Sequence, residues 1–130
     1  MQRQIHRKVE RTAEKIAESA GGRAEVRIEN KTPVTYNNPE LTRWALTSLQ
    51  AAAGTGNVSE INPRTGAEDF GFYGQKVPSF FFFLGGMPKG QQPDTAPGHH
   101  TPDFYIDESG LGLGVKAFCH LVLDYSNKTK

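Results

Sequence analysis

The chain has 130 residues, of which 36% are apolar and 22% charged, and its formal net charge is +1. These totals are typical of one globular domain, and the near-zero charge gives no argument for a nucleic-acid or membrane partner. A single cysteine, Cys119, excludes an intramolecular disulfide, and no apolar run approaches the ~20 residues that a membrane-spanning helix needs.

The first thirty residues predict a helix, a turn and a strand, and they lack the apolar core of a signal peptide. Apolar residues recur at helical spacing over residues 3–20, and Gly21 and Gly22 end the pattern. Apolar and charged residues then alternate over residues 24–29, which indicates a strand with one exposed face. Because these two elements cannot bury both apolar faces by themselves, we interpret them as the last elements of a larger unit.

The rest of the chain predicts helices and strands in alternation. We expect a connector, a helix, a short strand, a short helix, a strand and a final helix, at residues 32–36, 39–52, 58–61, 68–73, 79–84 and 108–125 respectively. The helix start at residues 37–40 combines an Asn cap, a proline at the first helical position and an acid in the first turn. The run Ser79–Leu84 is apolar on both faces, which is typical of a strand covered on both sides. The predicted fold class is therefore α/β.

Two adjacent histidines, His99 and His100, follow a loop rich in Gly, Pro and polar residues and precede a predicted helix. A histidine at such a place can present a neutral ring nitrogen to a metal, or act as an acid or base. Neighbouring loop residues point in different directions, so we expect at most one of the two rings to face a given site. The residue types fit two solvent-exposed loop histidines equally well.

Glu68 and Asp69 form the second cluster of interest, at the start of the predicted short helix. They can serve as a metal ligand, a general base or a pair that orients substrate. Acidic residues that complement the dipole of a helix N-terminus are the more common case, and the residue types alone favour it. A site with one or two metals needs at least three protein ligands on separate elements. With only these two clusters available, the chain is expected to hold part of a site.

Three other features point to no chemistry. The glycine run at residues 110–114 has the wrong spacing for a nucleotide-binding loop, and we reject such a site. Cys119 lies beside the apolar face of the last helix and is expected to be a buried small hydrophobe. The basic residues between Arg3 and Arg11 are balanced by glutamates on the same predicted helix, which indicates a solvated face and not a nucleic-acid site.

The blocks Gly66–Phe70 and His100–Glu108 together resemble the C-terminal part of the M20 metallopeptidases. The resemblance is to the amidohydrolase branch, which includes hippurate hydrolases, N-acyl-amino-acid amidohydrolases and auxin-conjugate hydrolases. Two further stretches, residues 77–85 and 111–114, match the pattern of the family, so the resemblance spans essentially the whole chain.

The resemblance implies two domains, of which the chain would hold the last third of the enzyme. Residues 1–33 would end a βαββαβ lid domain that is often used for dimerisation, so a homodimer is implied for the complete enzyme. Residues 34–130 would form the C-terminal part of a catalytic α/β sheet domain, with a return hinge near residues 33–37. A cytoplasmic location is favoured.

The resemblance also implies a site with two divalent metals, most often zinc and sometimes manganese or cobalt. His100 would be a metal ligand because it directly precedes the Thr-Pro step, and His99 is the runner-up. Glu68 and Asp69 would line the site, and we expect the His100 ring to open on a cleft within reach of Glu68. The other ligands and the general-base glutamate of the family belong to its N-terminal portion, which this sequence lacks.

The implied reaction is the hydrolysis of N-acyl amino acids or small peptides by metal-activated water. These 130 residues alone are expected to be inactive, because they lack the base and most of the ligands. The alternative is a non-catalytic interaction or dimerisation module, in which the first helix and strand form an edge for a partner.

Overall fold

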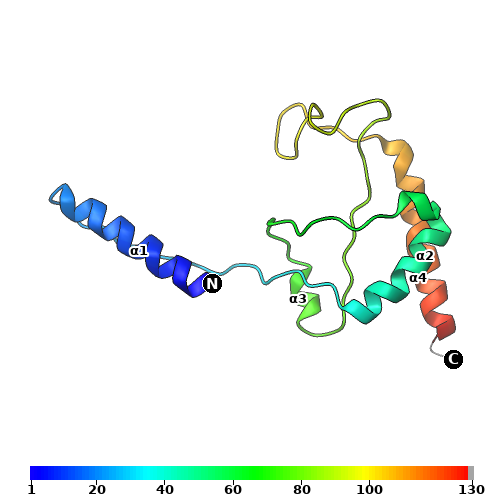
Figure 1. Ribbon diagram of the computed structural model, residues 1–130, viewed down its shortest axis with the longest axis horizontal. Coiled ribbons are helices and arrows are strands. Elements are labelled where there is room, and N and C mark those ends of the chain that lie inside the picture. Colours follow the sequence, from blue (N-terminus) through cyan, green and yellow to red (C-terminus); the bar gives the residue numbers. More distant parts are fainter. Residues whose placement is uncertain (129–130) are drawn as a thin grey trace. The chain divides into compact units, whose positions relative to one another are not determined.

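The computed structural model describes residues 1–128, which divide into two compact units, Met1–Thr32 and the remainder from Pro33 onward (Figure 1). The division lies beside the boundary expected after residue 33. Assignment of the units to a lid and a catalytic domain stays a prediction. None of the helices in the described part of the chain is long and apolar enough to cross a membrane.

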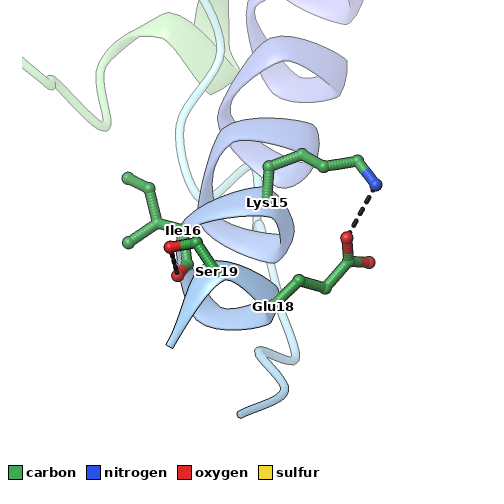
Figure 2. A network of polar contacts seen from close by, with 4 residues as sticks. All are labelled: Lys15, Ile16, Glu18 and Ser19. Atoms are coloured by element: carbon green, nitrogen blue, oxygen red, sulfur yellow. Dashed lines mark hydrogen bonds and ion pairs between the residues drawn. The ribbon is translucent and has the colours of Figure 1, made fainter. Parts of the chain in front are cut away.

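The first unit consists of helix α1, Gln2–Ser19, and an extended tail. Near the end of α1, Lys15 Nζ lies 2.7 Å from Glu18 Oε2, and Ser19 Oγ donates to the Ile16 carbonyl at 2.7 Å (Figure 2). Both charged side chains are mostly exposed, so the ion pair contributes little. The chain leaves the helix through Gly21 at a φ of +74°, in agreement with the predicted glycine stop.

The second unit is built on two helices that pack side by side, α2 (Pro39–Ala53) and α4 (Leu111–Lys128) (Figure 1). The Asn38 side chain caps α2 by accepting from the Leu41 N–H at 2.9 Å, as the sequence predicts. The buried apolar residues lie on these helices, and partly buried side chains pack against three of them, Leu49, Ala52 and Ala117. The first group is Ala45, Leu49, Ala52 and Ala117; the second is Val58, Phe80, Phe82 and Leu121.

Two polar contacts tie the same helices together. Ser48, which is buried, donates from Oγ to Asp124 Oδ2 at 2.6 Å. Lys116 Nζ donates to the Ala52 carbonyl at 2.8 Å and so satisfies one of the free carbonyls at the C-terminus of α2. Cys119 lies on α4 but is exposed, so the prediction of a buried thiol is wrong.

Three short helical turns complete the elements: η1 (Thr55–Asn57), α3 (Gly71–Gly74) and η2 (Glu108–Gly110). The short helix expected at residues 68–73 is therefore present, but it begins at Gly71 and Glu68 lies in the segment before it.

The predicted α/β sheet is wrong, because residues 1–128 contain no strand. The three stretches predicted as strands, 24–29, 58–61 and 79–84, run without a backbone partner in the ladder pattern of a sheet. A strand exists only through hydrogen bonds to a neighbour, and apolar patterning alone does not supply one. The aromatic run is also not covered on both sides, since Phe83 is 65% exposed.

A side chain takes the place of a neighbouring strand at the centre of the aromatic run. The Asn37 carboxamide accepts from the Phe81 N–H at 2.7 Å and donates to the Phe81 carbonyl at 2.8 Å. The next residue, Asn38, donates its N–H to the Ser79 carbonyl at 2.9 Å. The connector before α2 is thereby fixed to the aromatic run.

Candidate functional site

The two histidines lie in a long loop, residues 87–106, between the aromatic run and η2 (yellow to gold in Figure 1). The loop contains local turns: Thr101 Oγ1 donates to the Gly98 carbonyl at 2.7 Å, and the Phe104 N–H donates to the Thr101 carbonyl at 3.1 Å. These bonds enclose His99 and His100, so their backbone has a defined path although both residues are exposed.

His100 differs from its neighbour in backbone conformation. Its φ is +65°, and no other residue among 1–128 except glycines has a positive φ. This left-handed conformation costs an L-residue on the order of 1–2 kcal/mol, and such residues cluster at functional sites. The contacts described for residues 1–128 include no partner for the His100 ring. An exposed imidazole of this kind is available to a metal ion.

The His99 ring is occupied instead by an aromatic contact. It packs against the Phe104 ring with centroids 4.6 Å apart and planes inclined by 32°. A ring that is held by such packing is less free to turn a nitrogen toward a ligand. The His99 ring is thus packed and the His100 ring is not, and the choice of His100 as a metal ligand stays a prediction.

The Glu68 and Asp69 pair is arranged as the start of a helix. Glu68 is half-buried, and its Oε1 accepts from the Phe70 N–H at 3.1 Å. The Asp69 carbonyl accepts from the Phe72 N–H at 2.9 Å, and its side chain is exposed. The Phe70 ring anchors this turn against Phe81, with centroids 5.3 Å apart. One carboxylate oxygen of Glu68 thus stabilises the turn before α3.

The structure does not bring the two clusters together. The loop that carries the histidines and helix α3, which follows Asp69, lie well apart in the second unit (Figure 1). Among residues 1–128 no group of three or more His, Cys, Asp or Glu side chains is placed to hold a metal ion. The contacts described for residues 1–128 do not form the cleft that was expected between His100 and Glu68.

Asp107 is a residue of the loop region to which the sequence analysis gave no role. Its Oδ1 accepts from the Ser109 N–H at 2.9 Å and so caps η2. The Ser109 hydroxyl and then its backbone N–H hold the pKa of Asp107 below the ordinary value of 3.8, and the charge of Lys89 adds to this effect. The signal was present in the sequence, since an Asp directly before the start of a predicted helix is typical of a side-chain cap.

The model of the peptidase family M20/M25/M40 matches residues 4–124. The chain belongs to this family. Thermostable carboxypeptidases 2 and 1 of Saccharolobus solfataricus are each 36% identical to it over 109 residues, which is 83% of this chain and 26% of the relative. IAA-amino acid hydrolase ILR1-like 4 of Arabidopsis thaliana is 31% identical over 93 residues, which is 72% of this chain and 21% of the relative. No solved structure matches the chain significantly.

Membership of the M20 family confirms the resemblance that the motifs predicted. The chain spans about a quarter of the length of the relatives it matches. The M20 match also covers both motif blocks, because Gly66–Phe70 and all of His100–Glu108 lie between residues 4 and 124.

Proposed function

We propose that this chain supplies one part of the active site of a metal-dependent amidohydrolase or peptidase that cleaves N-acyl amino acids or small peptides. Family membership supports the proposal, since relatives carry the names carboxypeptidase and IAA-amino acid hydrolase. The observation that carries it is the exposed His100, held at a φ of +65° directly before the Thr101-Pro102 step.

The residues of this chain fit a metal as contributors and not as a complete site. His100 offers an exposed imidazole, while His99 packs on Phe104. Since residues 1–128 hold no three-ligand group, further ligands and the general base would have to come from polypeptide beyond these residues. We propose two divalent ions, zinc first and manganese or cobalt next. When bound, such ions lower the pKa of water and polarise the substrate carbonyl.

We also propose roles for the remaining site residues and for the two units. Glu68 and Asp69 would line the substrate cavity, with Glu68 fixing the Phe70 backbone by its hydrogen bond of 3.1 Å. We propose that residues 1–33 belong to a lid that pairs with a second copy, and that residues 34–130 belong to the catalytic domain. On this account the 130 residues alone are inactive.

The decisive experiment compares His100→Ala with His99→Ala in the full-length protein loaded with zinc. We expect His100→Ala to lower both bound zinc and hydrolysis of N-benzoylglycine, by more than the roughly 10–100-fold that is typical of changes around the ligands. His99→Ala is the matched control, and it should retain most of both. Hydrolysis and zinc content that survive His100→Ala unchanged would refute the assignment.

A second candidate is the interaction module without catalysis, which the apolar face of α1 favours. Ile5, Val9 and Ile16 on this helix are 52%, 49% and 65% exposed. Exposed apolar faces of this kind mark association sites, and the partner we propose is a second copy of the chain. Self-association measured by analytical ultracentrifugation, together with a complete lack of zinc binding and hydrolysis in the full-length protein, would favour this alternative.

A further inference from the structure

The long loop that carries His100 begins and ends at the same place. The Asp107 N–H donates to the Gly86 carbonyl at 2.8 Å, which joins the residue before the loop to the residue after it. We call this closure, formed by Gly86, Ile106 and Asp107, the neck of the loop. Because both ends are held together, the position of the loop relative to the helices depends on the neck.

The neck leaves little room for a side chain at residue 86. A Cβ atom built on Gly86 would lie 3.1 Å from Ile106 Cγ2 and 3.2 Å from Ile106 Cβ. The second distance matters more, because the position of a Cβ atom is fixed by its own backbone and no rotamer change relieves it. An alanine at residue 86 would therefore require Ile106 to shift by a few tenths of an ångström, and we expect this shift to weaken the neighbouring hydrogen bond between residues 86 and 107.

Two further close approaches continue on the helix side of the neck. A Cβ on Gly110 would lie 3.4 Å from the Gly85 carbonyl oxygen, and one on Gly114 would lie 3.0 Å from Leu84 Cδ2. Gly85 and Leu84 thus lie close to η2 and to the start of α4 respectively, while Gly86 lies against Ile106 and Asp107. The neck is anchored to α4, which packs on α2 and the buried apolar residues.

The Asp107 side chain holds the other half of the neck. Its carboxylate caps η2 through the Ser109 N–H, while its own N–H makes the bond to Gly86. One residue therefore links the end of the loop both to the residue that precedes the loop and to the helix that follows it. His100 lies seven residues before this link, and the loop has no secondary structure of its own.

We propose that Gly86 and Asp107 are positioning residues of the site: they close the neck and thereby set where the His100 ring is presented. This inference rests on the proposed role of His100 as a metal ligand. Neither residue touches the histidine, so both would act through the backbone of the loop.

The test compares Gly86→Ala with Gly85→Ala in the full-length protein. The two glycines are adjacent and neither has a positive φ, but a Cβ on Gly85 meets nothing within 4 Å. Three readouts are taken: hydrogen exchange of the Asp107 amide without metal, zinc affinity by chelator competition, and kcat and KM for N-benzoylglycine. Asp107→Ala is the second variant, and it removes the cap of η2 without adding a side chain to the neck.

For Gly86→Ala we expect faster exchange of the Asp107 amide, zinc affinity lower by roughly 10–100-fold, and a fall in kcat larger than any rise in KM. Gly85→Ala should match the wild type in all three. Asp107→Ala should lower zinc affinity in the same direction, which keeps the test decisive if Gly86→Ala fails to fold.

Three outcomes would overturn the inference. Equal exchange rates of the Asp107 amide in Gly86→Ala and Gly85→Ala would show that a side chain at residue 86 does not loosen the neck. Faster exchange with unchanged zinc affinity and kcat, in a protein that His100→Ala inactivates, would show that the neck does not position the histidine. If His100→Ala itself leaves zinc affinity unchanged, the proposed function of His100 fails first, and the positioning role fails with it.

Discussion

Replacing Leu49 with alanine is expected to lower the denaturant concentration at which helices α2 and α4 separate. Leu49 is 7% exposed, and it is the only large apolar side chain buried within residues 1–128; the other buried apolar residues are alanines. Two of these, Ala52 and Ala117, are its neighbours and have no atoms beyond Cβ with which to fill a cavity. Leu→Ala changes at buried sites cost roughly 2–5 kcal/mol, and because the partly buried side chains around the cluster can fill part of the cavity, we expect about 3 kcal/mol.

The assay uses Trp44, the only tryptophan of the chain. It lies on α2 and makes an edge-to-face contact with Tyr125 of α4, with centroids 5.4 Å apart, so its fluorescence reports the separation of the two helices. With a urea dependence of roughly 1–3 kcal/mol per molar, a loss of this size lowers the midpoint by about 1–3 M. The control is Leu123→Ala, since Leu123 also lies on α4 but is 63% exposed.

The control should change stability by no more than about 0.5 kcal/mol, as is usual for exposed positions. Equal midpoint shifts in Leu49→Ala and Leu123→Ala would refute the conclusion that the buried contacts between α2 and α4 hold the second unit together.

Two other measurements test local features. Ser109 lowers the pKa of Asp107 in the folded protein below 3.8. The ionised Asp107 side chain therefore stabilises η2 fully above pH 3.8, and this stabilisation is lost as the pH falls through the lowered pKa of Asp107. Ser109→Ala should raise this pKa toward 3.8 in a carboxyl NMR titration, and an unchanged titration would contradict the hydroxyl contribution. Gly54 ends α2 at a φ of +87°, so Gly54→Ala should lower the free energy of unfolding in urea by about 1–3 kcal/mol. The control is Gly56→Ala, which should lower it less because the φ of Gly56 is not positive. Equal losses in the two variants would argue against backbone strain at residue 54.

The helices could be predicted because their signals are local. The Asn38 cap and Pro39 fix the start of α2, and the period of apolar residues places α1 and α4 within a few residues of their observed bounds. Each of these signals concerns residues no more than four positions apart, which a sequence states directly.

The sheet could not be predicted in the same way, because a strand depends on a partner that is distant in sequence. Residues 79–84 have the composition of a buried strand, yet the backbone of Phe81 pairs with the Asn37 side chain, 44 residues away. Residues 24–29 alternate as a strand would, and within the described residues no second segment runs beside them in a ladder.

For the candidate site too, the local features could be predicted from the sequence and the contacts between distant segments could not. The motif gave His100 as a candidate, and the structure places this residue in an exposed loop before η2. Its positive φ and the packing of His99 on Phe104 depend on the three-dimensional path of the loop and left no mark in the residue types. The expected approach of His100 to Glu68 was an inference about distant segments, and the described contacts do not join them.

The hydrogen bonds of Asn37 have a consequence for solubility. Residues 79–84 are apolar, rich in aromatic side chains, and free of charge and proline, which is the composition of segments that pair between molecules as cross-β structure. Such pairing begins at unoccupied backbone N–H and C=O groups. At Phe81, the middle of this segment, both groups are occupied by one carboxamide. Asn37 therefore occupies two backbone groups of this segment that would otherwise be open to pairing with another molecule.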